Sequence, residues 1–446
     1  MPSNVLHGGN GANRPRFYTG WRRTLKRLPL AVRAWHYWTH PSAYPNFMLR
    51  PSRSGLVRSL QVEKRLGLTK LVEFKGYFFS SLTIPRFPSA AYDVAAARGG
   101  LNVMAAGTPA KDYVDHVILG ISRQCTYDCR HCYEQRNLSD KGAVPVSRWI
   151  TAISELQDIG VGIVILSGGE PMLRYQDVLA ILEAADKSRS DFHLHTSGHG
   201  VTVERARRLC EGGLVAAAVA LDDIDPDRFD DIRGSSGAFS RAVEALQAFS
   251  QAGIFTYANV CLSKRLVRSG DLWKLFDVLH NLGVGMVQLL EPRPCGGFSG
   301  KSMDELFEEA DKRAVEDFVH LGNSERRFAG HPALYYVAQM EHPSRMGCMM
   351  GGLSHFTIDS AGNVNPCVFV PVSFGNILTD DVRAVFTRMR EAIPAPIRRP
   401  CPSLLLADAL HSYQREHPGG TIAYEEIRDA WRAELSGEPE PEVRLL

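Results

Sequence analysis

From about residue 113 to residue 300, short apolar runs alternate with longer segments in which apolar residues recur every three or four positions. The short runs predict buried strands, and the periodic segments predict helices. Strands are expected at 116–122, 161–166, 192–195, 215–221, 255–262 and 286–290. Helices are expected at 146–159, 176–187, 203–211, 240–252 and 272–282. Six strands joined through helices predict parallel pairing with right-handed crossovers, and such sheets bind ligands at the carboxyl ends of their strands.

The pattern is less regular outside this region. We expect a helix at 56–66, a strand at 72–79, a long charged helix at 304–321, a hairpin at 355–367 and helices within 404–435. These changes divide the chain into five parts. They are a basic aromatic arm (1–54), a small segment without assignable chemistry (55–112), the α/β core (113–300), a second domain (301–402) and a helical tail (403–446).

Length and composition fit a globular protein of two or three domains. The chain has 446 residues, of which 44% are hydrophobic and 22% are charged. A net charge of +2 gives no field that favours nucleic acid, so no nucleic-acid partner is expected. The longest apolar run, 214–221, is too short to cross a membrane, and the first ten residues lack the apolar run of a signal peptide. Nine cysteines then favour a reducing, cytoplasmic location and metal binding over disulfides.

The first 60 residues have a composition of their own. They contain ten Lys and Arg, no Asp or Glu, and half of the six tryptophans of the chain. Cations mixed with Trp and Tyr suit a membrane surface, which would place the protein peripherally at the inner face of the membrane through residues 1–54. The same mixture suits RNA or an acidic peptide, or an arm that packs its rings on the rest of the protein. Pro29, Pro41, Pro45 and Pro51 exclude one continuous helix.

Three cysteines lie within eight residues, at Cys125, Cys129 and Cys132. Thiolates are soft ligands that favour iron–sulfur clusters or zinc, and closed sites of either kind usually take four ligands. Three ligands leave one metal position open, where a substrate or cofactor can bind. The alternative is a zinc knuckle that His131 or a distant cysteine completes.

This CxxxCxxC motif resembles the signature of the radical S-adenosylmethionine (SAM) enzymes. A second motif, Gly168-Gly169-Glu170-Pro171, follows the second expected strand and resembles the GGEP motif of the same family. The resemblance covers roughly residues 113–300 and implies a partial (β/α)6 TIM-like barrel. It also implies that Cys125, Cys129 and Cys132 bind three irons of a [4Fe–4S] cluster, whose fourth iron is chelated by SAM.

The resemblance further implies a set of SAM contacts at the strand ends. The turn from Gly168 to Pro171 would meet the amino group of SAM, with Glu170 as an acceptor. Ser197 and Asp222, after the third and fourth strands, would contact the ribose or the carboxylate of SAM, although each also suits a loop cap. Arg233-Gly234 resembles a common Arg-Gly of the family, and its alternative is a surface ion pair.

A second group of cysteines follows the α/β core. The spacing Cys348-x13-Gly362-x4-Cys367, with Cys401 further on, resembles the twitch/SPASM extension of one branch of the family. That resemblance implies one auxiliary iron–sulfur cluster at Cys348, Cys367 and Cys401. A fourth ligand is left open, and Cys295 is one candidate. The alternative for Cys348 and Cys367 is buried apolar cysteine, and we assign Cys210 and Cys261 to the core.

The resemblance implies a radical enzyme, an oxidoreductase or a transferase. A flavodoxin- or ferredoxin-type donor would reduce the first cluster, SAM would be cleaved to a 5′-deoxyadenosyl radical, and this radical would take a hydrogen from the substrate. We expect a peptide or a small molecule as substrate, in peptide or cofactor maturation. The alternatives are a lipid or membrane-associated molecule and, from another class, a non-catalytic iron–sulfur or zinc scaffold. The complete motifs favour the enzyme.

Overall fold

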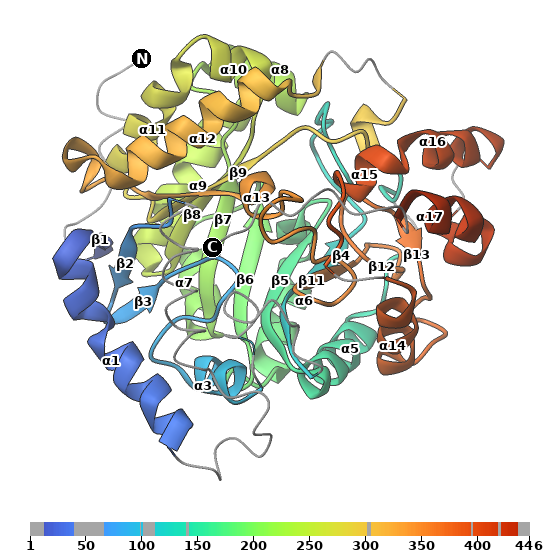
Figure 1. Ribbon diagram of the computed structural model, residues 1–446, viewed down its shortest axis with the longest axis horizontal. Coiled ribbons are helices and arrows are strands. Elements are labelled where there is room, and N and C mark those ends of the chain that lie inside the picture. The colour runs from blue at the N-terminus through green and yellow to red at the C-terminus, as the bar shows by residue number, and fades with distance from the viewer. Residues whose placement is uncertain are drawn as a thin grey trace.

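The computed structural model describes residues 13–39, 67–98, 100, 112–139, 142–300, 305–393, 396–417 and 421–435. Its centre is a nine-stranded sheet in the order β10-β9-β8-β7-β6-β5-β4-β11-β12 (Figure 1). The six consecutive strands of the α/β core are β4 (Val114–Ser122), β5 (Val161–Gly168), β6 (Asp191–Thr196), β7 (Leu214–Ala220), β8 (Phe255–Cys261) and β9 (Met286–Leu290). Each pairs in parallel with the next. The expected α/β fold with a partial barrel is therefore confirmed.

Two further parallel strands extend this sheet at its edges. Strand β10 (Ala333–Tyr336) pairs with β9, and β11 (His355–Ile358) pairs with β4. Strand β12 (Val364–Asn365) returns antiparallel to β11, as expected for a hairpin in this region. The segment after residue 300 is thus built onto the barrel sheet, close to the strand that leads into the cysteine motif.

Helices cover the outer face of the sheet, where the main apolar core lies. They are α5 (Val146–Ile159), α6 (Tyr175–Ala184), α7 (Val203–Glu211), α8 (Pro226–Arg233), α9 (Ala238–Ala252), α10 (Lys264–Arg268), α11 (Asp271–Asn281) and α12 (Glu309–Ser324). The expected core strands and helices are confirmed to within three residues at each end, because buried strands and amphipathic helices both leave clear apolar periods. The charged helix begins at residue 309, later than expected, and residues 301–304 lie outside the described part.

A small antiparallel sheet covers the inner face of the barrel. It consists of β1 (Arg16–Tyr18), β2 (Leu71–Phe74) and β3 (Tyr77–Phe79). The ring of Phe79 stacks on Phe255 of β8, with the ring centroids 3.8 Å apart. The expectation of one strand over 72–79 is wrong, because Lys75 and Gly76 both adopt positive φ (50° and 81°) and turn the chain into a hairpin.

Helix α1 (Gly20–Thr39) lies along one edge of the molecule, on the side opposite α16 and α17 (Figure 1). Pro29 lies inside α1 and does not end this helix, whereas strand β1 precedes it, so the described part of the arm is not one continuous helix. Pro29 has no amide hydrogen, so the carbonyl of Leu25 lacks its helical hydrogen bond. The side chain of Leu25 is exposed, so water can reach this carbonyl. Pro41, Pro45, Pro51 and the helix expected at 56–66 lie outside the described residues.

The C-terminal tail packs against the second domain. The two contain a set of short helices, and they are joined by a parallel pair formed by β13 (Val372–Ser373) of the second domain and β14 (Ile422–Ala423) of the tail. These helices are α13 (Val337–Met340), α14 (Val382–Ala392), α15 (Pro402–Leu405), α16 (Ala407–Glu416) and α17 (Arg428–Leu435), and α3 spans Ala90–Ala97 near the N-terminal sheet. Trp431 of α17 is buried against Phe374, which fixes the tail. Among the described residues, no helix is long and apolar enough to span a bilayer.

Candidate active site

A cavity of about 640 Å³ joins the strand ends of the barrel to the second domain. All three cysteines of the first motif line it, and so do Cys295, just after β9, and Cys367 of the second domain. Among the residues named from the sequence, those on the cavity wall are Cys125, Cys129, His131, Cys132, Gly168, Gly169, Ser197, Asp222, Arg233, Cys295 and Cys367. The fold therefore brings thiols from both cysteine groups to the wall of one cavity.

The two glycines after β5 let the GGEP turn pack directly on the segment that leads into Cys125. The amide of Gly169 donates to the Ser122 carbonyl at 2.7 Å, and the amide of Glu170 donates to the Gln124 carbonyl at 2.7 Å. A Cβ on Gly168 would lie 2.6 Å from the Ser122 oxygen, and a Cβ on Gly169 would lie 2.3 Å from the Gln124 oxygen. Only glycine fits at either position, because both contacts are with backbone atoms.

On its other side, the cysteine loop pairs with the end of α8. The amide of Asp128 donates to the carbonyl of Arg233 at 3.1 Å. The guanidinium of Arg233 is buried, forms an ion pair with Asp222, and lies 3.7 Å from the sulfur of Cys129. Burial alone would lower the pKa of Arg233, but the negative charge of Asp222 raises it overall. The interpretation of Arg233 as a surface ion pair is therefore wrong.

The thiols of the first motif are free and electrostatically close to one another. Burial raises the pKa of Cys125 to about 11 and, with the neighbouring Cys129, that of Cys132 to about 12. A metal that binds here must displace these protons, and it then holds the sulfurs as thiolates. The set therefore has the chemistry of a soft-metal site, with the positive charge of Arg233 beside it.

Glu170 is fully buried behind the cavity wall, as is Pro171. Its carboxylate accepts four hydrogen bonds: from Met172 N (2.9 Å), Thr196 Oγ1 (2.7 Å), Ser197 N (2.8 Å) and Ser197 Oγ (2.5 Å). A carboxylate has about four acceptor positions, so groups of this chain occupy all of them. These contacts join the ends of β5 and β6 and give Glu170 a positioning role.

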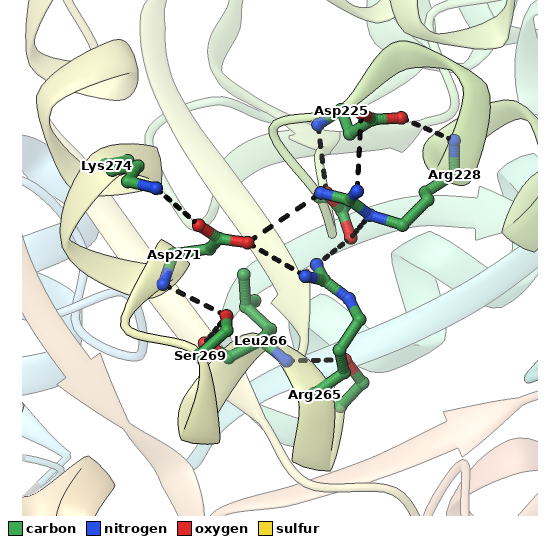
Figure 2. A network of polar contacts seen from close by, with 9 residues as sticks. Asp225, Arg228, Arg265, Leu266, Ser269, Asp271 and Lys274 are labelled. Carbon is green, nitrogen blue, oxygen red and sulfur yellow. Dashed lines mark hydrogen bonds and ion pairs between the residues drawn. The ribbon is translucent and has the colours of Figure 1, made fainter.

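The two aspartates after β7 point in different directions. Asp222 accepts from the amide of Cys261 at 2.8 Å, and the ring of His131 lies 3.5 Å from it. Asp223 instead faces the helices outside the barrel, where it pairs with Arg228 at 3.1 Å and with Arg265. Figure 2 shows the network around these arginines, which also includes Asp225, Asp271 and Lys274. Only Asp222 is therefore available to the cavity.

The thiol of Cys295 interacts electrostatically with the second group. Burial raises the pKa of Cys295 to about 12, and the next contribution comes from Cys401. Burial also raises the pKa of Cys348 and of Cys367, with further contributions from Cys401 to each. Cys401 thus lies electrostatically close to the other three. A set of four thiols matches the usual ligand number of an iron–sulfur cluster.

An arginine also accompanies the second group, with a side chain that is 12% exposed. Arg293 forms an ion pair with Glu291 at 3.1 Å, and the hydroxyl of Tyr336 also bonds to Glu291. Burial alone would lower the pKa of Arg293, but the neighbouring Cys401 and Glu291 raise it overall. Among the described residues, no group of three or more His, Cys, Asp or Glu side chains converges as a site for a single metal ion.

Sequence reasoning missed several residues of the cavity. Arg293 carries no motif, although it lies two residues before Cys295. Tyr257, Asn259 and Cys261 face the cavity from β8, so the assignment of Cys261 to the core is wrong, whereas Cys210 packs against the core. The sequence does contain a pattern that points to these three residues. Side chains of a strand alternate between its two faces, and Ala258 and Val260 of β8 form the opposite, apolar face. The Tyr257 hydroxyl lies 2.7 Å from Nε2 of His195, within the same wall.

Comparisons with known proteins agree with this architecture. Residues 119–264 match the model of the radical SAM superfamily, and residues 348–399 match that of SPASM, an iron–sulfur cluster-binding domain. A PqqA peptide cyclase of Streptomyces rochei is 27% identical over 255 residues, which are 56% of this chain and 68% of that protein. An AdoMet-dependent heme synthase of Methanosarcina barkeri is 26% identical over 285 residues, which are 59% and 79% of the two chains.

A solved structure shares the fold. Streptococcus suis SuiB bound to precursor peptide SuiA matches with a TM-score of 0.52 at 17% identity, over 66% of this chain and 69% of that one. The radical SAM domain implies a [4Fe–4S] cluster and SAM, and the SPASM domain implies additional iron–sulfur clusters. The chain therefore carries a radical SAM domain, followed by a C-terminal SPASM domain.

Proposed function

We propose that this protein is a radical SAM enzyme that acts on a substrate held between two iron–sulfur clusters. Cys125, Cys129 and Cys132 would hold the first [4Fe–4S] cluster. When bound, this cluster and SAM supply a one-electron reductive cleavage of the C5′–S bond, and the resulting 5′-deoxyadenosyl radical takes a hydrogen atom from the substrate. The observation that carries the proposal is the shared cavity, whose wall contains the three thiols, the glycine turn and two thiols of the second group.

The residues of the chain would position and enclose SAM. Gly168 and Gly169 expose backbone to the cavity, and Ser197 and Asp222 present polar side chains from the neighbouring strand ends. Glu170 and Pro171 lie behind this wall, where Glu170 fixes Ser197 through two hydrogen bonds. Their proposed contribution to SAM binding is therefore to hold the turn in place. A substrate that fills the cavity would limit the access of water to a reactive intermediate.

The second group would hold one auxiliary cluster with four protein ligands. Cys348, Cys367 and Cys401 come from the second domain, and Cys295, just after β9, completes the set. Four thiolates would close the cluster, so that it has no open iron for substrate. Such a cluster is suited to accept or pass an electron, and Arg293 would offset part of its negative charge.

For the substrate, we favour a peptide or a cofactor precursor. Support comes from the relatives, which include a peptide cyclase and a heme synthase. We place the reaction among those of oxidoreductases or transferases, with a flavodoxin- or ferredoxin-type electron donor in the cytoplasm. We also retain the proposed division into an α/β core (113–300) and a second domain (301–402), and both family models match inside these ranges.

SAM cleavage by the reduced protein tests the proposal and separates an enzyme from a scaffold. Anaerobically reconstituted protein is reduced with dithionite, mixed with SAM, and assayed for 5′-deoxyadenosine and methionine. We expect both products from the wild type and from Cys210→Ala, which changes a cysteine outside both groups, and neither product from Cys129→Ala. A wild-type protein that is loaded with iron but forms no 5′-deoxyadenosine would overturn the proposal.

A further inference from the structure

Helix α1 turns its apolar side chains to solvent. Over residues 20–29, the part of α1 whose side chains are described, Trp21 is 69% exposed, Leu25 is 53% exposed and Leu28 is 52% exposed. The spacing of four and three places all three on one face of the helix. Among the described residues, five large apolar side chains are exposed, and these three are the majority. The other two are Leu173 and Leu378.

The polar side chains of α1 hold the helix on the protein. The guanidinium of Arg23 donates to the Leu68 carbonyl at 2.8 Å, and Lys26 lies 3.6 Å from the carboxylate of Glu73 in β2. A surface helix of a globular protein normally does the reverse, with its apolar face on the core and its polar face in water. Among the described residues, this apolar face is open to solvent, and a row of large exposed apolar side chains of this kind marks an interaction surface.

The segment that carries this face is basic enough to suit an anionic surface. Residues 1–60 carry ten Lys and Arg and no acidic residue. Arg22 lies 5.5 Å from the Trp21 ring, at the edge of the apolar face. Trp at the level of lipid headgroups and cations that attract anionic lipid are the features of a helix that lies in a membrane interface. An acidic protein partner would explain the cations, but not a row of exposed Trp and Leu.

The same helix borders the opening of the active-site cavity. Arg23, Thr24, Arg27 and Leu28 line the cavity. Because Thr24 and Leu28 are also exposed to solvent, the cavity reaches the surface beside α1. A surface that covered the apolar face would therefore lie next to this opening.

We propose that α1 docks the protein on an anionic lipid bilayer, with the cavity opening toward the membrane. The apolar face inserts at the interface, and the surrounding cations bind anionic headgroups. A substrate with a lipid-soluble part, such as an amphiphilic cofactor precursor or a membrane-bound peptide, then enters the cavity from the bilayer. The docking rests on α1 alone, whereas this route to the cavity rests on the function proposed above.

Vesicle sedimentation tests the docking. Reconstituted full-length protein is mixed with vesicles of phosphatidylcholine alone or with one-third phosphatidylglycerol. We expect binding to the anionic vesicles that weakens with salt, and an at least tenfold lower affinity for the variant Trp21→Glu/Leu25→Glu. Leu378→Glu is the matched control, since Leu378 is equally exposed (53%) but lies in the second domain. This control should bind as the wild type does.

Three outcomes would overturn the proposal. They are wild-type protein that stays in the supernatant, a double variant that binds like the wild type, and a wild-type dimer that the double variant dissociates. The last would show that a second copy covers the face. Neither Trp21 nor Leu25 lines the cavity, so dithionite-driven SAM cleavage without substrate should be unchanged in the double variant. A loss of membrane binding with SAM cleavage intact thus separates the docking from the proposed function.

Discussion

The backbone amide of Gly297 donates a hydrogen bond to the carbonyl oxygen of Cys132, over 2.9 Å. Gly297 follows Cys295 by two residues, so this one contact joins the loop of the first cysteine group to a cysteine of the second. The approach is close: a Cβ on Gly296 would lie 2.1 Å from the Cys132 oxygen, and one on Gly297 would lie 2.3 Å from the Arg130 oxygen. We infer that a change at this contact affects both groups.

The variant Gly297→Ala tests this link. Its methyl group would collide with the backbone of Arg130, so the loop that carries Cys132 must move. We expect a lower iron content per chain and an altered electron paramagnetic resonance spectrum of the reduced first cluster. Gly330→Ala is the control, because its Cβ would meet nothing nearer than His280 at 3.9 Å. Equal iron content and identical spectra in both variants would show that the contact has no such role.

Arg233 should stabilise the protein as well as the first site. The variant Arg233→Met leaves the carboxylate of Asp222 buried without its ion-pair partner, which costs about 3–5 kcal/mol in comparable cases. We expect a lower free energy of unfolding by urea and a faster loss of iron on dilution. The control is Arg207→Met, which removes a solvent-exposed ion pair with Glu204. Its free energy of unfolding should fall by about 1 kcal/mol or less. Similar losses in both variants would argue against a special role of Arg233.

Glu170 should affect SAM affinity without holding a metal. In Glu170→Gln, an amide NH₂ replaces one acceptor oxygen, so it opposes a donor of Thr196 or Ser197. We expect SAM to bind about tenfold more weakly, a difference of about 1.4 kcal/mol, at an unchanged iron content. Equilibrium dialysis with reconstituted protein measures this. Glu183→Gln, on the exposed side of α6, should bind SAM normally. If both variants bind alike, the hydrogen bonds of Glu170 do not support the SAM site.

The barrel was predictable because its signals are local. Buried parallel strands give continuous apolar runs, and the helices between them give periods of three to four, so the order of elements follows from the chain itself. Strand β10 was not predicted, since it has only four residues, and the parallel pairing of the predicted hairpin strand β11 with β4 was not predicted either, because it joins segments far apart in the chain. The hairpin at Lys75–Gly76 was missed because apolar residues flank the turn on both sides.

The site was predictable to the extent that its residues form motifs. The spacing identified both cysteine groups, but it left Cys295 as one candidate among others, because only the folded chain brings it to Cys401. For the same reason, sequence did not reveal that Arg233 and Arg293 lie beside the thiols. The carboxylate of Glu170 has all of its acceptor positions occupied because Thr196 and Ser197, at the end of the next strand, donate hydrogen bonds to it. Only the tertiary structure brings these residues together.

Asp115 should make stability depend on pH. It is buried at the start of β4, and this burial raises the pKa of its carboxyl to about 7, although a hydrogen bond from Ser354 (2.6 Å) opposes the shift. A raised pKa means that the folded state holds the proton more tightly, so this contribution to stability is complete below about pH 4 and is lost as the pH rises to about 7. In Asp115→Asn, the side chain is neutral at every pH.

We therefore expect the wild type to lose stability relative to Asp115→Asn between pH 4.5 and pH 7, by at most about 1.4 kcal/mol per pH unit. Urea unfolding of both proteins across this range measures the difference. Above about pH 7.5 the difference should level off. A difference that stays constant from pH 4.5 to pH 8 would contradict the account of Asp115.

The central claim, two iron–sulfur clusters at the two cysteine groups, is tested most directly by iron and sulfide content after anaerobic reconstitution. The account predicts about eight irons per chain in the wild type and in Cys210→Ala. It predicts about four in a Cys125/Cys129/Cys132→Ala variant and about four in a Cys295/Cys348/Cys367/Cys401→Ala variant. About four irons in the wild type and none without the first group would contradict the second cluster, and zinc in place of iron in every protein would contradict the radical SAM function.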